Sequence, residues 1–125
     1  MIRLRPAEPQ DSWAAYQLRK QIQPDLQLAA HDHWWTDTWE HRFMAYDGPV
    51  LVGIIRLSQE GVIHLLVAEK ERGKGLGTQM LQAIKRVAKE LGFAQLQARV
   101  EPANIASQRA FLGAGYRPTQ FEVVL

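Results

Sequence analysis

A glycine-rich stretch at residues 72–77 has the residue types to bind an anion. Gly73, Gly75 and Gly77 alternate there with Arg72, Lys74 and Leu76. Because glycine has no Cβ, the backbone can take positive φ at these positions and come close to a ligand. A helix that begins here would point its first N–H groups into the same space, where the helix dipole favours negative charge. The stretch therefore predicts a cradle for a phosphate or pyrophosphate.

A strand and a long helix must hold this stretch in place. Residues 62–67 form a short apolar run that is typical of a strand. After the glycines, apolar residues recur at helical spacing, namely Leu76, Met80, Ile84, Val87 and Leu91, and Gly92 suits the position just past a helix C-terminus. A strand at 93–100 would complete a strand–helix–strand unit, which implies a right-handed crossover and locally parallel pairing.

The whole chain predicts a mixed sheet with helices on both faces, an α/β (α+β) fold with the order β-α-α-β-β-β-α-β-α-β. The expected elements are a strand at 2–5, helices at 13–22 and 31–35, strands at 39–46, 50–57 and 62–67, the helix that starts at Leu76, a strand at 93–100, a helix at 102–112 and a strand at 121–125. We expect one domain, residues 1–125, because a chain of this length buries about two-thirds of its unfolded surface around a single core.

Composition excludes several classes of protein and of site. The chain has no cysteine, which removes disulfides, thiolate metal sites and a cysteine nucleophile. Its net charge is only +2 and no basic run occurs, so a nucleic-acid partner is not expected. No signal peptide or apolar run of membrane-spanning length is found, so we expect no membrane partner and a cytoplasmic protein.

Two other glycine motifs fail on single residues. The dinucleotide pattern G-x-G-x-x-G needs glycine where Thr78 or Met80 stands. A P-loop needs serine or threonine after its Gly-Lys pair, and Gly75 occupies that position. A simple structural turn is the remaining alternative to an anion cradle.

The glycine stretch and the residues downstream of it resemble the acetyl-CoA segments of the GNAT superfamily of N-acyltransferases. Residues 72–77 fit the pattern R/Q-x-x-G-x-G/A, and Asn104 with Ser107, followed by Phe111 and the pair Gly115-Tyr116, is similar to the family's second CoA segment. The resemblance is strongest over residues 50–116. It implies the GNAT fold, also called the acyl-CoA N-acyltransferase fold, whose fourth and fifth strands (here 62–67 and 96–100) splay apart to form a slot.

The resemblance implies acetyl-CoA as the cosubstrate. Its pyrophosphate would lie on the glycine stretch and its pantetheine arm along the end of the preceding strand. The residues implied in binding it are Leu66, Val67, Arg72, Gly73, Lys74, Gly75, Leu76, Gly77, Thr78, Asn104, Ser107 and Arg109. A metal site from the histidines near residue 31 is not expected, because they present no i,i+4 pair.

The resemblance also implies direct attack of an amine on the thioester in a ternary complex. The expected oxyanion donor is a backbone N–H at a bulge of the fourth strand, that of Leu65 or Leu66. Phe111 stands where many relatives carry a tyrosine that acts as general acid to the thiolate. Tyr116 is the substitute candidate for that acid, with packing as its alternative role.

The general base has two candidates. His64 lies on the fourth strand and titrates in the right range, and Glu101 lies at the end of the fifth. The alternatives are a packed histidine and a solvated strand end.

The acceptor amine is expected on the side of the first two helices and the β-meander. The residues implied there are His31, His33, Trp34, Trp35, Glu40 and His41. Tryptophans beside His and Asp suit stacking on a sugar or nucleobase, and core packing is the alternative. The run 31–35, with 53–57 and Phe111, is similar to a GNAT subgroup that acetylates nucleotide-linked amino sugars.

The sequence thus predicts an acetyl-CoA-dependent N-acetyltransferase, a monomer or homodimer, that acts on a primary amine of a small molecule. One alternative is a non-catalytic acetyl-CoA-binding regulatory module, which Phe111 and the unplaced base permit. The other is a different acceptor, a protein N-terminus or a lysine amine.

Overall fold

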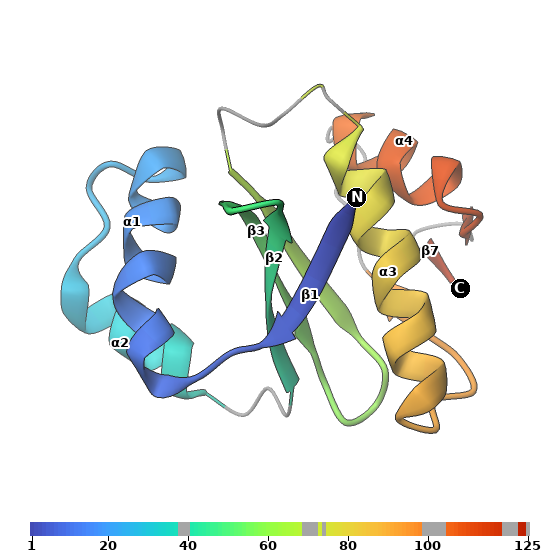
Figure 1. The fold of residues 1–125 in the computed structure, drawn as a ribbon, viewed down its shortest axis with the longest axis horizontal. Helices are drawn as coiled ribbons and strands as arrows, with labels where there is room; N and C mark the ends of the chain where they lie inside the picture. Colours follow the sequence, from blue (N-terminus) through green and yellow to red (C-terminus); the bar gives the residue numbers. More distant parts are fainter. Residues whose placement is uncertain (38–40, 69–72, 74, 99–104, 119–122, 125) are drawn as a thin grey trace.

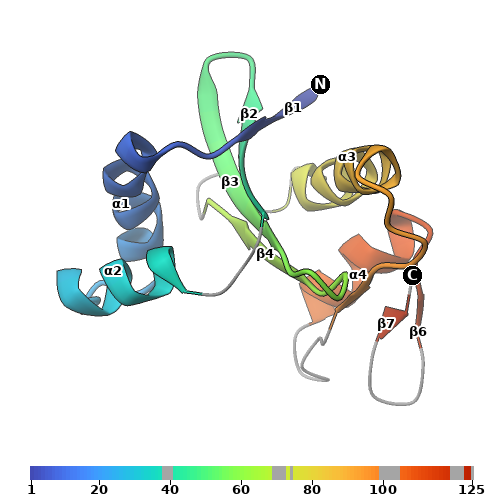
Figure 2. The same cartoon turned by 90° about the horizontal axis from the view of Figure 1, so that it is seen from below.

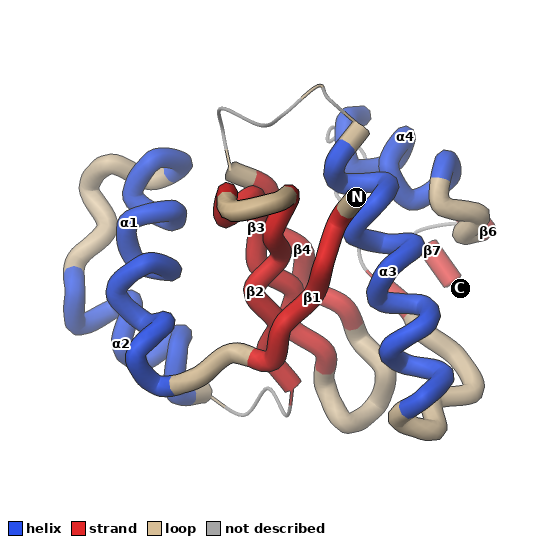
Figure 3. The backbone as a smooth tube through the Cα atoms, viewed as in Figure 1, coloured by secondary structure: helices blue, strands red, loops and turns tan. Residues whose placement is uncertain are grey.

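The computed structural model describes residues 1–37, 41–68, 73, 75–98, 105–118 and 123–124. A four-stranded sheet forms the middle layer, and helices cover both of its faces (Figure 1). The first two helices of the chain lie on one side of this sheet and the last two on the other, as Figure 3 shows. The predicted arrangement of helices on both faces is confirmed.

The central sheet is an antiparallel meander with the order β1-β2-β3-β4. Its strands are β1 (Ile2–Pro6), β2 (His41–Asp47), β3 (Val50–Leu57) and β4 (Ile63–Val67). Side chains alternate between the faces, so Phe43 and Ile55 join one core cluster while Met44 and Ile54 join the other. The sheet is buried on both sides, which explains the almost unbroken apolar run of β3.

Two short helices cover the face of Met44 and Ile54. A 3-10 turn, η1 (Pro9–Asp11), leads into α1 (Ser12–Ile22), and α2 (Leu28–Thr36) follows. Ala15 and Leu18 of α1 are buried against this face. α1 ends before Pro24, as predicted, since proline disfavours a helical residue before it.

The long helix α3 (Leu76–Glu90) covers the opposite face and has the predicted apolar stripe. Leu91 lies past its end and is exposed, so its expected place in that stripe was wrong. The reason is the helix stop at Gly92, which has φ +92. The N–H of Phe93 donates to Ala88 O and that of Gly92 to Lys89 O, the pattern of a Schellman cap.

The C-terminal third forms a smaller sheet beside α4. After β5 (Gln97–Ala98) come α4 (Ile105–Gly113), β6 (Arg117–Pro118) and β7 (Val123–Val124), with the antiparallel order β5-β7-β6. Two predictions change here. Residues 93–96 are not part of the strand expected at 93–100, and the chain adds a strand, β6, before its last one. Strands of two residues carry too little periodicity to be recognised in sequence.

β4 and β5 separate almost at once. Within the described part of the chain they meet at one parallel bridge, Val62 with Gln97, where the N–H of Gln97 donates to Gly61 O at 2.9 Å. Figure 2, the view from below, shows β4 running away from the small sheet that holds β7 and β6. The locally parallel pairing is confirmed, and so is the splay of the two strands.

Candidate functional site

The start of α3 presents backbone donors to open space. Gly75 is the N-cap residue with φ +75, and no side chain caps the helix. The first helical bond runs from the N–H of Gln79 to Gly75 O, so the N–H groups of the first turn have no partner within the helix. A Cβ built on Gly73 or Gly75 would meet no atom of the described residues within 4 Å. These residues fit a pyrophosphate, and Arg72 and Lys74 lie outside the described residues.

The register of β4 decides which of its backbone groups face the splay. The N–H of Ala68 donates to Val52 O and that of Ser58 to Val62 O, so even-numbered residues of β4 bond to β3. The N–H and C=O groups of Leu65 and Val67 therefore point the other way, toward β5. Of the two predicted oxyanion donors, Leu65 has its N–H on the edge that faces away from β3, whereas the N–H of Leu66 faces β3.

Two further predictions about β4 change. The β3–β4 register is continuous from Gly53–Val67 to Leu57–Ile63, so the expected bulge is not found in these residues. The backbone of Leu66 bonds to β3, which leaves Val67 as the residue whose backbone can pair with an extended ligand. The side chain of Leu66 instead lines a cavity on the other face of the sheet.

α4 lies against the first turn of α3. The hydroxyl of Thr78 donates to Ala110 O at 3.4 Å, and a Cβ on Gly77 would lie 3.5 Å from Ala110 Cβ. Ser107 and Arg109 are on the same helix one turn or less before Ala110, half-buried and exposed, respectively. Asn104, predicted to bind the pantetheine, is outside the described residues.

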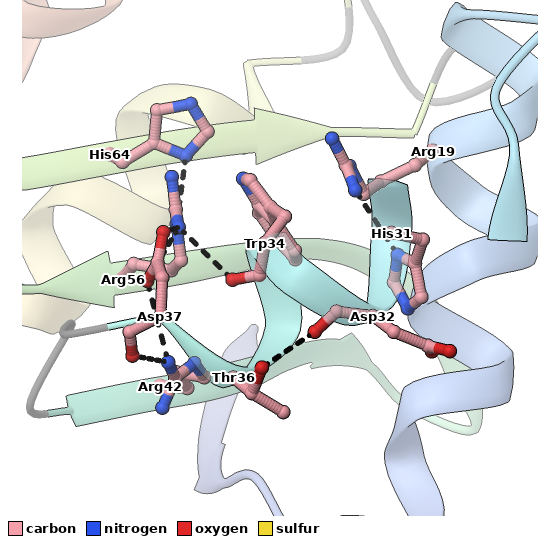
Figure 4. Close-up of polar contacts among 9 residues, drawn as sticks. All are labelled: Arg19, His31, Asp32, Trp34, Thr36, Asp37, Arg42, Arg56 and His64. Atoms are coloured by element: carbon pink, nitrogen blue, oxygen red, sulfur yellow. Dashed lines mark hydrogen bonds and ion pairs between the residues drawn. The ribbon is translucent and has the colours of Figure 1, made fainter. Parts of the chain in front are cut away.

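A cavity of about 130 Å³ lies between the first two helices and β4. Its lining residues are Arg19, Ile22, Gln23, Trp34, His64 and Leu66. Trp34 has a guanidinium near its ring on two sides, because the Cζ atoms of Arg19 and Arg56 are each 4.1 Å from the ring centroid. Figure 4 shows Trp34 between these arginines, with His64 above Arg56. Of the five predicted acceptor residues that the structure describes, the cavity lining includes Trp34 alone.

The carboxylate of Asp37 pairs with two arginines beside this cavity. Arg56 is 5% exposed on a strand that is otherwise apolar, and its Nη1 lies 3.2 Å from Asp37 Oδ2. Arg42 Nη2 lies 3.5 Å from the other carboxylate oxygen of Asp37. Burial lowers the pKa of Arg56 to about 10, and Asp37 opposes that effect. Asp37 therefore keeps two neighbouring cations in place under α2.

His31 is a structural residue that ties α2 to α1. It is fully buried; its Nε2 lies 2.9 Å from Ser12 O, and its Nδ1 lies 3.2 Å from Arg19 Nη1. The neutral tautomer with a proton on Nε2 satisfies both contacts, since it donates to Ser12 and accepts from Arg19. Burial lowers the pKa of His31, in keeping with that neutral form. His31 was predicted to bind the acceptor, whereas these contacts show that it positions Arg19.

The other predicted acceptor residues lie elsewhere. His41 shares the sheet face of Phe43 and stacks on Phe43 and Phe93, so it lies on the α3 side and not on the α1 side. His33 is exposed on α2, and Trp35 packs into the cluster beneath α1 and α2. Glu40 is outside the described residues. The predicted acceptor role of His41 disagrees with the structure, because a strand places successive side chains on alternate faces and His41 takes the face of Phe43, away from the cavity.

His64 is half-buried in the cavity wall. Its Nδ1 accepts a hydrogen bond from Arg56 Nε at 3.4 Å, and its ring meets the edge of Trp34. Burial, with Arg56 and Arg19 nearby, lowers the pKa of His64 to about 4. It is therefore neutral at pH 7 and a weak proton acceptor, poorly matched to the role of general base.

We expect the protein to lose stability as the pH falls from about 6.5 toward 4, with His64 responsible for part of the loss. Its folded pKa of about 4 lies below the ordinary value of 6.5. The unfolded chain then binds the proton more readily, so the contribution of His64 is present above pH 6.5 and lost as the pH falls through the folded pKa. Urea unfolding at pH 7 and pH 5 measures this slope.

The matched variant is His64→Gln, which keeps a neutral polar side chain and cannot titrate. Its unfolding free energy should change less between pH 7 and pH 5 than that of the wild type, while His31 retains its own contribution in the same direction. Equal slopes in the two proteins would contradict the lowered pKa of His64.

Tyr116 and Phe111 pack together under α3. The hydroxyl of Tyr116 donates to Leu81 O at 3.0 Å, and the two rings lie 5.1 Å apart. Burial raises the pKa of Tyr116, so its proton is held more firmly than in water. These contacts describe the packing role of Tyr116. Glu101, the second candidate base, is outside the described residues.

Sequence reasoning missed Arg19 and the residues beside it. Arg56 had a visible signal, because a lone charge in the apolar run 50–57 must be paired or functional. Arg19 had none, since a basic residue near a helix C-terminus ordinarily faces solvent. Its place in the cavity depends on how α1 and α2 pack together.

The chain belongs to the acetyltransferase (GNAT) family, whose model matches residues 7–116. It is therefore an acyltransferase of the GNAT type. Comparison with curated proteins gives no sequence match.

Solved structures share the fold at low identity. One is the aminoglycoside acetyltransferase AAC(6′)-Ib in complex with coenzyme A and kanamycin, 17% identical with a TM-score of 0.87 over 100% of this chain and 94% of that chain. Another is spermidine N-acetyltransferase from Vibrio cholerae with CoA and spermine, 16% identical with a TM-score of 0.75 over 98% and 91%. A domain from Methanocaldococcus jannaschii is 20% identical, with a TM-score of 0.77 over 99% and 96%. The predicted GNAT fold is confirmed.

The described residues contain neither a cluster of metal ligands nor a helix that could span a membrane. No three His, Cys, Asp or Glu side chains among them gather closely enough to hold a metal ion. None of the helices in the same residues has the length and apolarity to span a membrane.

Proposed function

We propose that this protein is an acetyl-CoA-dependent N-acetyltransferase that acetylates a primary amine of a small molecule. The observation that carries the proposal is the position of β4 between two sites. At its edge, the backbone N–H and C=O groups of Leu65 and Val67 point toward the slot between β4 and β5. On its face, the side chains of His64 and Leu66 line the cavity. A donor along the edge and an acceptor in the cavity would meet at the same strand.

The donor site uses backbone groups. The first turn of α3 and the open positions at Gly73 and Gly75 suit a pyrophosphate, and Val67 suits an extended arm. Acetyl-CoA supplies an acetyl group activated as a thioester. The N–H of Leu65 can donate a hydrogen bond to the acyl oxygen as negative charge develops there.

The reaction needs a neutral amine and a leaving thiolate. The amine nitrogen forms a bond to the acetyl carbon while the C–S bond breaks, which gives an N-acetyl amine and a thiolate. The proton lost by nitrogen passes to water, and water protonates the thiolate. A thiol with a pKa near ~8.5 leaves without a general acid, which is consistent with the buried positions of Phe111 and Tyr116.

Small-molecule acceptors are supported by the structural neighbours, one of which is solved in complex with kanamycin and another with spermine. The cavity of about 130 Å³ is below the roughly 300–1,000 Å³ of sites for drug-sized ligands. It suits a small amine, or the amine end of a larger molecule, better than a protein surface.

The test is release of free thiol from acetyl-CoA in the presence of a panel of amines. We expect turnover with at least one small primary amine, and mass spectrometry should show the product heavier by one acetyl group. Coenzyme A binding without turnover on any small amine, protein N-terminus or lysine peptide would favour the regulatory module. Turnover on peptides alone would overturn the small-molecule acceptor.

A further inference from the structure

Arg19 is the charged residue of the cavity whose charge no described carboxylate balances. The ion pairs of the described residues include Arg56 and Arg42, both with Asp37, but not Arg19. Its side-chain hydrogen bond among the described residues is with His31, a neutral ring. A guanidinium has five N–H donors, so most of those of Arg19 remain for a ligand.

Two contacts hold Arg19 in place for such a ligand. Its guanidinium lies over Trp34 at 4.1 Å, and the buried ring of His31 fixes one of its nitrogens at 3.2 Å. Stacking and one hydrogen bond leave an edge of the planar fork exposed to the cavity that Arg19 lines. In Figure 4 the guanidinium of Arg19 extends from its contact with His31 toward the strand that carries His64. Such a fork matches a carboxylate or a phosphate.

The electrostatics around the cavity favour an anion. Arg42 and Arg56 share one described carboxylate, that of Asp37, and Arg19 lies on the other side of Trp34 from Arg56. Burial lowers the pKa of Arg19, so a compensating negative charge would be stabilised there. Asp32 of α2 is exposed and points away from Trp34 in Figure 4. A polycationic amine would meet repulsion at this site.

We infer that the acceptor is an anionic or zwitterionic amine, one that carries a carboxylate or a phosphate on the same small molecule, and that Arg19 binds this anionic group. The inference rests on the proposed function, because it names the substrate class of the same site. Arg19 then determines specificity, and the amine lies toward Leu66 and the open edge of β4.

The experiment compares matched amines that differ in one anionic group. β-Alanine with its amide tests a carboxylate, and phosphoethanolamine with ethanolamine tests a phosphate. Glucosamine 6-phosphate with glucosamine, and a UDP-linked amino sugar, extend the phosphate arm to sugars, and spermidine represents a polycation. We expect kcat/KM to favour the anionic member of at least one pair by about 10–100-fold, the usual contribution of a charge-assisted hydrogen bond.

Three variants of one position test the assignment. Arg19→Gln should raise KM for the anionic amine about 10–100-fold and leave that of its neutral partner unchanged. Arg19→Glu should reverse the preference, and Arg19→Lys should retain most of it. Lys20→Gln is the matched control, because it removes the same charge from the next residue of α1, outside the cavity lining.

The outcomes separate the two proposals. Turnover with equal or better activity on neutral amines or spermidine overturns the inference and leaves the proposed function standing. An equal loss on both members of a pair in Arg19→Gln also overturns it, since a merely structural role would act on both. If no amine is acetylated, calorimetric titration of the same pairs in the presence of CoA decides the inference separately, and anionic amines should bind more tightly to the wild type than to Arg19→Gln.

Discussion

Gly75→Asp is expected to weaken acetyl-CoA binding at least about 100-fold while the protein stays folded. Gly75 lies at the N-cap of α3, and a new Cβ there meets no atom within 4 Å in the part of the chain that the structure describes. Asp tolerates the left-handed region better than most residues, so the backbone cost is small. Its carboxylate would stand at the mouth of the cradle, where two charges about 4 Å apart repel by roughly 4 kcal/mol at an effective dielectric constant of 20. At 1.4 kcal/mol per tenfold change, that exceeds 100-fold.

Two variants control for strain and for charge. Gly75→Asn has nearly the same shape and tolerance of positive φ but no charge, so it should retain most of the binding. Gly92→Asp places the same carboxylate at another open positive-φ glycine, just past the far end of α3. Calorimetric titration of coenzyme A and thermal unfolding measure both properties. Wild-type affinity in Gly75→Asp would mean that the donor does not bind at the start of α3.

Gly53→Ala is expected to destabilise the protein by about 3 kcal/mol, the upper end of the range for an overpacked core. A Cβ at this position of β3 would lie 2.4 Å from Leu66 O and 2.5 Å from Met80 Cε. The carbonyl belongs to the β3–β4 ladder and cannot move without loss of pairing. Met80 can rotate, but it is fully buried in a filled core. Urea unfolding at pH 7 measures the change.

Gly77→Ala is the matched control for Gly53→Ala. Its new Cβ would lie 3.5 Å from Ala110 Cβ and 3.7 Å from Val67 Cγ2, which are ordinary contacts. Removal of a glycine from a helix stabilises it by up to about 1 kcal/mol, so this variant should be neutral or more stable. Similar unfolding free energies for the two variants would contradict the close approach of β3, β4 and α3.

The two predictions concern different properties of one strand. Gly53 sets how closely β4 packs on β3, and Gly75 opens the site at the end of the loop that leaves β4. A shift of β4 caused by Gly53→Ala would move both the backbone edge at Leu65 and the cavity wall at His64. Residual activity of that variant should therefore fall along with its stability.

The apolar periodicity of the sequence and its turn residues were sufficient to predict the order of the helices and strands. The apolar spacing from Leu76 onward, with Gly92 as its stop, predicted α3 to within a residue of its end. Three apolar runs divided by turn residues predicted the meander. These signals are local, since helix and strand periods and glycine conformations depend on near neighbours.

The acceptor side could not be read in the same way. A strand places successive side chains on opposite faces, and the face that His41 takes depends on how β2 pairs with β1 and β3, which no local pattern specifies. The cavity joins Arg19 of α1, Trp34 of α2 and His64 of β4, three residues from separate parts of the chain. Their meeting depends on how two short helices pack on the sheet, and no local pattern encodes that packing.

The sequence by itself determined the glycine turn, the helix that begins there and the acyltransferase family to which the chain belongs. Only the tertiary structure showed that the N–H of Leu65, and not that of Leu66, points toward the slot between β4 and β5, and that Trp34 lies between two arginines. The physical reason is the sequence separation of the residues in contact. A turn and a helix start are made by residues adjacent in sequence, whereas strand register and the burial of Arg19 and Arg56 are decided by contacts between distant segments.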